Sequence, residues 1–424
     1  MRVFHINLNN FRAFAHITLN IDRHMTVIVG GNGSGKSTIM DGLAISLASF
    51  LSNIHRQNVC VIQACDVHEE TRDQGNHLER QVQYPAVIQC AGTVFGKQVT
   101  WSRSLVSANA VVTHDDVTQI TGMWDSVRRD IPGLILPVLC YYGSHRLCGC
   151  GSFSDAPNLN SRFAGYENCL DGTIASDKLL YPWLEHMTCE GDQDSPTLQA
   201  VNSTIIACLN ALGQDSEIGH AIDCHYNVIT HDVEITCISP DGKKILLALS
   251  KLSDGLRGIL CMVADIACRM ALLNPHLRGY ITAETDGIVL IDDIELHLHP
   301  SLQRHIVRIL RTLFPRIQFV LTSHAPSIIS SVPSEEIIIL KGGQAYTPVT
   351  PTYGKDDNAI LTQIMHVPIR QDDAAAAIDQ FHTAFATDEL ETAKQLLLVL
   401  KTMLGENDPA VVSAEMALDL AILE

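Results

Sequence analysis

Apolar and polar residues alternate in three segments at the start of the chain, at residues 2–10, 13–21 and 24–30. Each segment is rich in β-branched or aromatic residues, and polar breaks separate them, so the pattern predicts three β-strands. The third segment ends on glycines, and from Lys36 onward the apolar residues recur at helical spacing. The pattern therefore predicts the order strand, glycine loop and helix.

The rest of the chain mixes helical and strand-like patterns, and no internal repeat is visible. In chain order the predicted elements are a strand pair around a Phe-Gly-Lys turn within 81–106, a buried strand at 134–143, helices near 176–188 and 196–212, a hairpin within 224–249, a helix from Ser253 to about Asn274, a buried strand at 287–293, a helix from Pro300 to Phe314, and a strand at 317–323. Residues 355–424 have mostly helical periodicity, with Ala-rich and Leu-rich faces.

The composition is that of a compact globular protein, with 46% hydrophobic and 18% charged residues. The first residues lack the basic region and apolar run of a secretory signal, and no stretch approaches the roughly 18 apolar residues of a membrane span. We therefore expect a soluble, cytoplasmic protein without membrane contact. The net charge of −18 opposes unassisted binding along a nucleic-acid backbone.

The 13 cysteines are scattered, so reduced thiols are expected. Cys140, Cys148 and Cys150 form the one cluster that could begin a zinc site, but no matching distal pair follows. Ordinary buried or loop cysteines are the preferred interpretation, and zinc is the alternative.

Residues 30–37 read GGNGSGKS, a full match to the phosphate-binding loop between a predicted strand and a predicted helix. In such a loop the glycines let main-chain amides approach phosphate oxygens, and the start of the helix favours an anion. Lys36 is expected to reach the β- and γ-phosphate oxygens, and Ser37 to ligate Mg²⁺. The expected nucleotide-binding residues are Asn32, Gly33, Ser34, Gly35, Lys36, Ser37 and Thr38.

The segment GIVLIDD at 287–293 is an apolar run that ends in two carboxylates. A buried parallel strand presents such residues at the sheet edge where ligands bind in α/β proteins. Asp292 is expected to hold the hydrated Mg²⁺, and Asp293 to orient or activate a water molecule. We expect Glu295 to lie too far along the exit of the strand to replace Asp293.

Two further elements complete the pattern. LSDGLRG at 252–258 begins a predicted helix, with Ser253 as a cap that offers a second helix start to a phosphate. LTSHAP at 321–326 ends a predicted strand and brings His324 to the same sheet edge as Asp292. In isolation, the first would be a capped surface helix and the second a structural histidine.

The order of these four elements resembles that of the ABC ATPase superfamily. The resemblance implies an α/β ABC-type (SMC-like) P-loop ATPase head that binds ATP and Mg²⁺, with an α+β insertion and a C-terminal helical segment. It makes Ser253 and Gly255 part of the signature motif, Asp292 and Asp293 part of Walker B, and His324 the switch histidine. The expected segments are 1–106 with Walker A, the insertion 107–222, 223–350 with the other motifs, and the helical segment 351–424.

The same resemblance implies a dimer or a higher homo-oligomer of heads packed head to tail. Each ATP would lie between Lys36 of one chain and Ser253–Gly255 of the other. Asp293 stands where such ATPases usually carry glutamate, and it is one methylene shorter, so slow hydrolysis is expected. Asp293 and His324 are the expected catalytic residues.

Within the superfamily, NNFRAF, LSDGLRG and IDDIELHLHP resemble the SMC-like and RecF-like branch. In that branch Arg12 approaches the nucleotide; an exposed arginine at a strand end is the alternative. His297 and His299 are interpreted as loop residues near the dimer interface. A transporter engine is disfavoured, because its signature usually reads LSGGQ and lies closer to the phosphate loop.

More narrowly, LPVLCYYGSHR and YGKDDNAILTQIM, together with these motifs, resemble the PtuA-type ATPases of Septu antiphage systems, including those carried with retrons. This resemblance implies a regulatory ATPase that controls a separate HNH-type nuclease (PtuB-like). If the system is retron-borne, a reverse transcriptase and msDNA are further partners. The chain itself shows no HNH-like or Toprim-like pattern.

Two alternatives stay open. The chain could instead be an SMC-like or RecF-like repair or recombination ATPase that acts directly on DNA. The amphipathic C-terminal helices suit either a partner groove or self-assembly, or else a helical cap on the ATPase.

Overall fold

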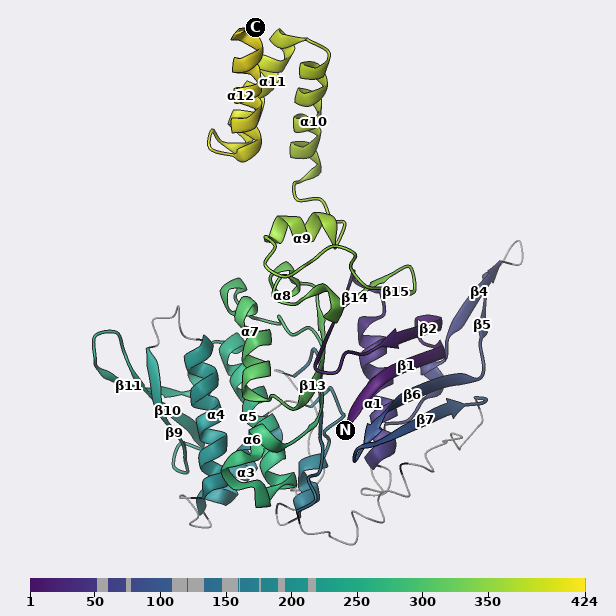
Figure 1. The fold of residues 1–424 in the computed structure, drawn as a ribbon, viewed down its shortest axis with the longest axis vertical. Helices are drawn as coiled ribbons and strands as arrows, with labels where there is room; N and C mark the ends of the chain where they lie inside the picture. Colours follow the sequence, from purple (N-terminus) through teal and green to yellow (C-terminus); the bar gives the residue numbers. More distant parts are fainter. Residues whose placement is uncertain are drawn as a thin grey trace. The chain divides into compact units, whose positions relative to one another are not determined.

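The computed structural model describes residues 1–51, 60–73, 78–108, 120, 133–146, 159, 161–174, 177–189, 195–212 and 219–423 (Figure 1). They form two compact units, Met1–Asp356 and Asp357–Glu424. Among these residues, no helix combines the length and apolarity needed to cross a bilayer.

A six-stranded sheet forms the centre of the first unit, in the order β15-β14-β3-β13-β12-β8. The strands β14, β3, β13, β12 and β8 run parallel, and only β15 is antiparallel to its neighbour. Their bounds are β3 Met25–Gly30, β8 Val138–Tyr142, β12 Gly287–Ile291, β13 Ile317–Ser323, β14 Ile337–Lys341 and β15 Gln344–Tyr346.

Every residue of β3, β8, β12 and β13 is buried. Parallel strands covered on both faces read as continuous apolar runs, which is why the sequence predicted β8, β12 and β13, whereas β3 was predicted from its alternating pattern. β8 belongs to the range 107–222, which the sequence pattern assigns to an insertion, yet it forms the outer parallel strand of this sheet. Cys140 is a buried residue of β8. Cys148 and Cys150, the other two cysteines of the possible zinc site, lie outside the described residues.

A four-stranded antiparallel sheet has the order β2-β1-β6-β7. Its strands are β1 Arg2–Phe11, β2 Phe14–Asn20, β6 Ala86–Val94 and β7 Lys97–Leu105, and a ribbon of β4 Glu69–Asp73 and β5 Leu78–Val82 stands apart from it. Phe95 and Gly96 both have positive φ in the turn between β6 and β7, the conformation of a tight two-residue hairpin. The predicted strand pair around this turn is confirmed.

Helix α1 (Lys36–Leu51) is packed between the two sheets, and nearly all of its residues are buried. A helix that is apolar all around requires partners on every side. The indole Nε1 of Trp101 on β7 donates to Ser46 O (3.0 Å) and Ser46 Oγ (2.7 Å), which fixes α1 to the antiparallel sheet. The position of the loop that precedes α1 is therefore set by the packing of both sheets.

The remaining elements of the first unit are helical, apart from a small antiparallel sheet in the order β11-β10-β9. Their bounds are α3 Asp177–Cys189, α4 Pro196–Leu212, β9 His220–Asn227, β10 Asp232–Ile238, β11 Lys244–Ala248, α5 Asp254–Leu273, α6 Ile281–Glu284, α7 Pro300–Leu313 and α8 Pro326–Ile329. Short 3₁₀ turns lie at Ala64–Asp66, Arg162–Tyr166, Leu249–Lys251, Pro275–Tyr280 and Ser334–Glu336.

The second unit contains α9 Asp357–Gln363, α10 Asp372–Ala386, α11 Leu390–Leu404 and α12 Pro409–Leu423. The last three helices share a small core around Phe381 and Leu400, so this unit has an interior of its own. Its basic side chains are paired with acids: Arg370 with Asp408, Lys394 with Glu391 and Lys401 with Glu415.

Candidate nucleotide site

The loop at residues 30–37 connects β3 to the start of α1. Gly33 (φ +76°) and Gly35 (φ +95°) lie in the left-handed region, which residues with a side chain rarely adopt. At Gly35 a Cβ atom would also lie 2.4 Å from Cζ of Phe14, so the aromatic ring of β2 supports the loop directly. At Gly31 and Gly33, by contrast, a Cβ atom would have no neighbour within 4 Å. The main chain of the loop is therefore open to a ligand at these two residues.

Lys36 is almost fully buried, and its ammonium group donates to the carbonyl oxygens of Gly30 (3.0 Å) and Gly31 (3.2 Å). Burial lowers the pKa of Lys36, while the carboxylates of Asp293, Asp292 and Glu295 act in the opposite direction. The lysine charge is thus held over the loop itself, next to the position that a triphosphate takes in such loops.

Asp292, directly after β12, is held by two hydroxyl groups. Ser37 Oγ donates to its Oδ2 (2.8 Å), and Thr322 Oγ1 at the end of β13 donates to its Oδ1 (2.5 Å). A serine hydroxyl and a carboxylate oxygen are hard ligands of the kind that Mg²⁺ prefers. The donor set at Ser37 and Asp292 therefore fits a magnesium ion.

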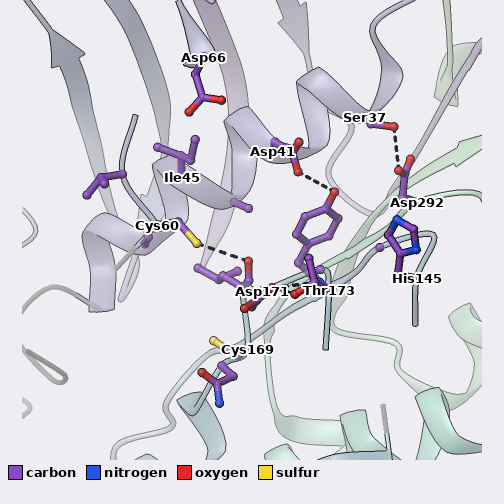
Figure 2. A pocket seen from close by; sticks show the side chains of 18 of the residues that line it. Ser37, Asp41, Ile45, Cys60, Asp66, His145, Cys169, Asp171, Thr173 and Asp292 are labelled. Atoms are coloured by element: carbon purple, nitrogen blue, oxygen red, sulfur yellow. Dashed lines mark hydrogen bonds between the residues drawn. The ribbon is translucent and has the colours of Figure 1, made fainter. Parts of the chain in front are cut away.

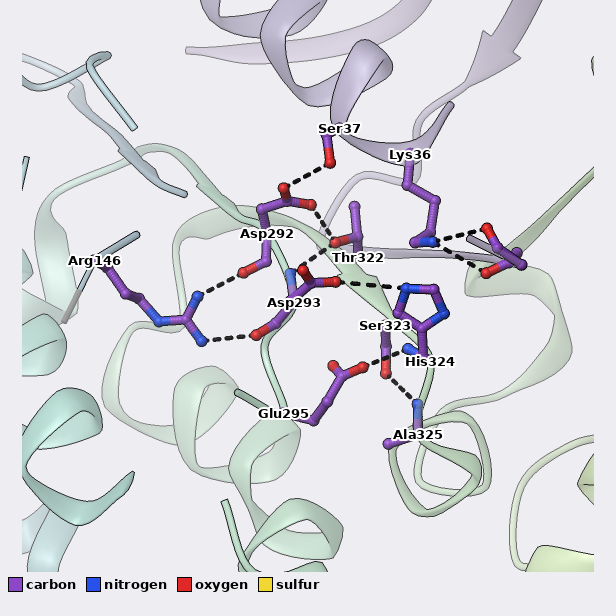
Figure 3. A network of polar contacts seen from close by, with 12 residues as sticks. Lys36, Ser37, Arg146, Asp292, Asp293, Glu295, Thr322, Ser323, His324 and Ala325 are labelled. Carbon is purple, nitrogen blue, oxygen red and sulfur yellow. Dashed lines mark hydrogen bonds and ion pairs between the residues drawn. The ribbon is translucent and has the colours of Figure 1, made fainter. Parts of the chain in front are cut away.

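Asp293 and His324 follow the neighbouring strands β12 and β13, and their side chains face each other (Figure 3). His324 Nε2 lies 3.7 Å from Asp293 Oδ1. Burial raises the pKa of Asp293, and the charge of Asp292 adds to this effect, while His324, Lys36 and Arg146 oppose it. A carboxylate with a raised pKa is a stronger proton acceptor than an exposed one.

Arg146 is a site residue to which the sequence reasoning assigned no role. Its guanidinium donates to the main-chain oxygens of Asp292 (2.5 Å) and Asp293 (2.7 Å), on the side of these aspartates opposite His324 (Figure 3). Burial lowers the pKa of Arg146 to about 10, against the pull of the nearby carboxylates. The segment LPVLCYYGSHR ends in this arginine shortly after a buried strand, and that position is the sequence signal from which Arg146 could have been found.

Glu295, which the sequence pattern leaves as no replacement for Asp293, nevertheless contacts a residue of this site. Its Oε1 accepts the main-chain N–H of His324 at 2.5 Å. The cause is the backbone of Asp293, whose φ of +46° turns the chain back toward β13. The main-chain N–H of Ile294 then donates to Thr322 O (3.1 Å), which fixes this return.

A cavity of about 710 Å³ opens beside Ser37 and Asp292 (Figure 2). One wall is a face of α1 that includes Asp41 and Ile45, and the opposite wall comes from β8 and residues 166–173. Arg12 also lines the cavity, where it forms ion pairs with Asp41 and, at 2.8 Å, with Asp66. Arg12 therefore follows the end of β1 and lines the cavity, with its guanidinium paired to two carboxylates.

Tyr141 belongs to the cavity wall formed by β8. Its hydroxyl donates to Asp41 Oδ1 (2.8 Å) and so connects this wall to α1. Asp41, Asp66 and Tyr141 were not singled out from the sequence, because their contacts join segments that are distant along the chain.

Ser253 is the exposed residue that precedes α5, but its side chain makes no capping hydrogen bond. Gly255 is buried, and a Cβ atom there would lie 2.3 Å from His297 O, so the start of α5 packs on the loop after β12. His297 has φ +59°, and His299 precedes α7, where its Nδ1 accepts from Ser301 N (3.3 Å). Among the described residues, no hydrogen bond or ion pair joins Ser253 or Gly255 to the phosphate loop of the same chain.

The parallel sheet and the phosphate loop, with aspartates and a histidine at adjacent strand ends, define the chain as an α/β P-loop ATPase with an ABC-type head, a nucleotide-binding protein. Residues 5–200 match the family described as "AAA domain", and residues 229–330 match "AAA domain, putative AbiEii toxin, Type IV TA system". The first range includes the phosphate loop, and the second includes Asp292, Asp293 and His324.

The chain is similar along its whole length to the Retron Ec83 probable ATPase of Escherichia coli, with 24% identity and coverage of 88% of that protein. It is also similar to the Septu protein PtuA of Bacillus mycoides (strain KBAB4), with 37% identity over 92 residues. This stretch covers 22% of this chain and 12% of that protein. The resemblance to Septu and retron ATPases is thereby confirmed. Among solved structures, an SMC head bound to the C-winged helix domain of ScpA matches with a TM-score of 0.49 and 12% identity, over 84% of this chain and 98% of that one.

Replacement of Thr322 by valine tests the support of the two aspartates. Thr322→Val leaves Asp292 Oδ1 and the main-chain N–H of Asp293 without their partner. We expect the free energy of unfolding to fall by about 1–3 kcal/mol, measured by thermal and urea unfolding. Thr312→Val, on the exposed side of α7, is the matched control. Equal effects of the two substitutions would contradict the support role.

Proposed function

We propose that the chain binds ATP with Mg²⁺ at the carboxyl ends of β3, β12 and β13 and hydrolyses it. The observation that carries this proposal is the convergence of the phosphate loop, Asp292, Asp293 and His324 on one sheet edge. Lys36 and the loop amides of residues 32–38 would contact the phosphate oxygens. Ser37 and Asp292 would hold Mg²⁺. When bound, Mg²⁺ would neutralise the charge on the β- and γ-phosphate oxygens.

The nucleoside part is proposed to occupy the cavity beside Ser37. The cavity begins at the two proposed magnesium ligands and extends along α1, so a group attached to the phosphates would enter it. Its wall of Ala44, Ile45 and Ala48 suits the face of a base, and Arg12 stands at its polar side.

Asp293 would orient the attacking water and accept its proton, with His324 alongside to hold the γ-phosphate or the water. The aspartate side chain is one methylene shorter than the glutamate usual in ABC ATPases. We therefore propose slow turnover, so that the bound state of ATP persists.

Two substitutions separate binding from turnover. Lys36→Ala removes a charge-assisted contact and should weaken ATP binding by about 10- to 100-fold, measured by titration calorimetry. Asp293→Asn should keep the affinity within about twofold but lower kcat by about 100-fold or more, measured by phosphate release. Lys341→Ala at the end of β14 serves as the control. Normal turnover by Asp293→Asn would refute the role of this carboxylate.

The site is proposed to be completed by a second copy of the chain, packed head to tail. Ser253 is exposed at the start of α5 and, in the part of the chain that the structure describes, forms no hydrogen bond or ion pair with the phosphate loop of its own chain. A phosphate bound at Lys36 of one copy could therefore be reached by the α5 start of another, which would make association depend on ATP.

Ser253→Arg tests this arrangement. The bulky cation should leave ATP binding by the monomer within about twofold and abolish ATP-dependent association, measured by light scattering with Asp293→Asn as the background. Thr230→Arg, on the exposed turn between β9 and β10, should associate normally. Unchanged association of Ser253→Arg would exclude a head-to-tail site.

We further propose that this ATPase is the regulatory subunit of an antiphage defence complex and controls a separate HNH-type nuclease. The similarity to the Retron Ec83 probable ATPase and to the Septu protein PtuA supports this proposal. A reverse transcriptase and msDNA are partners if the system is retron-borne.

Co-expression with an HNH nuclease encoded beside this chain tests the partnership. The two proteins should co-purify, and the ATPase alone should cut neither DNA nor RNA. Deletion of residues 357–424, which form a separate compact unit, should abolish co-purification if this unit binds the nuclease. Retained binding after the deletion would show that the C-terminal helices serve the ATPase itself.

A further inference from the structure

We propose that Glu295 positions His324 for hydrolysis by accepting its main-chain N–H. The proposal rests on the proposed ATPase reaction and adds a residue that the motif pattern leaves without a role. Glu295 contacts neither the phosphate loop nor Asp293 by a hydrogen bond among the described residues, so it acts through His324.

The first observation is the way in which the pairing of β12 and β13 continues past their ends. The regular ladder between the two strands ends at the pair Ile291 and Leu321, but Asp293 N donates to Thr322 Oγ1 (2.8 Å) and Ile294 N donates to Thr322 O (3.1 Å). The bond from His324 N to Glu295 Oε1 is the third and last of this series. A side-chain carboxylate thus supplies the acceptor that a further strand residue would otherwise provide.

The second observation is that His324 is held at two points by the same loop. Glu295 holds its main chain, and Asp293 faces its imidazole at 3.7 Å. The next residue, Ala325, is fixed separately, since its N–H donates to Ser323 Oγ at 3.0 Å. Loss of the Glu295 contact would therefore free the backbone at His324 while leaving β13 and the start of α8 in place.

The third observation concerns the other oxygen of the carboxylate. Glu295 Oε2 is buried and has no hydrogen-bond partner among the described residues. Only one oxygen is thus committed to a contact, and glutamine can reproduce that contact with its amide oxygen. Alanine and aspartate cannot, because alanine lacks an acceptor and aspartate is one methylene too short.

The test measures kcat and ATP affinity for Glu295→Ala, Glu295→Gln and Glu295→Asp, with Glu335→Ala, an exposed glutamate outside the site, as the control. We expect Glu295→Ala and Glu295→Asp to lower kcat by roughly 10- to 100-fold, because small misplacements of a reacting group have effects of this size. ATP affinity should stay within about twofold, and Glu295→Gln should retain most of the turnover. If Glu295→Gln is as slow as Glu295→Ala, the carboxylate acts by its charge or as a base, and the proposal fails.

A double-mutant cycle asks whether Glu295 acts through His324. In a His324→Ala background, the further change Glu295→Ala should lower kcat by less than about twofold, because the positioned group is already gone. Additive losses would overturn the proposal.

Amide hydrogen exchange of His324 in the nucleotide-free protein gives a readout that does not require turnover. Exchange should be at least about tenfold faster in Glu295→Ala and unchanged in Glu295→Gln. If the wild-type protein binds ATP but shows no hydrolysis, the proposed reaction is wrong, and exchange alone decides the positioning. Equal exchange in wild type and Glu295→Ala would refute the proposed contact.

Discussion

The burial of α1 between two sheets is the constraint on which the rest of the first unit depends. Nearly all residues of this helix are buried, so its direction and depth are set by the six-stranded sheet on one side and the antiparallel sheet on the other. Its first turn carries main-chain N–H groups that no residue within the helix can satisfy. A helix start fixed in this way at a sheet edge suits a phosphate ligand, because the amides need not move when the ligand arrives.

Charge balance at the same edge follows from this placement. Asp292, Asp293 and Glu295 supply negative charge after β12, and Lys36 and Arg146 supply buried positive charge. A bound triphosphate would add further negative charge to a place already rich in carboxylates. Mg²⁺ is thus an electrostatic requirement of the proposed site.

Much of this arrangement could be predicted from the sequence. The phosphate loop and the strands ending at Asp292 and Ser323 were predictable because the apolar runs of buried parallel strands and the glycine pattern are local signals. Arg146 and Tyr141 were not assigned roles, because their partners lie more than 90 residues away along the chain. The strand order β12-β8 brings Arg146 to Asp292, and a contact between β8 and α1 brings Tyr141 to Asp41. The contact of Glu295 with the main chain of His324 was not predicted, since a positive φ at an aspartate has no reliable sequence signature. β14 and β15 were also not predicted, although β14 pairs directly with the strand that leads into the phosphate loop.

The contact between Phe14 and Gly35 has a consequence for the genetics of the protein. Position 35 excludes a side chain for two independent reasons: the ring of Phe14 occupies the space, and the backbone has a φ of +95°. A smaller residue at position 14 would remove the first obstacle and leave the second. Second-site suppressors of a substitution at Gly35 should therefore not arise at position 14 alone, and reversion to glycine should dominate any selection for restored function.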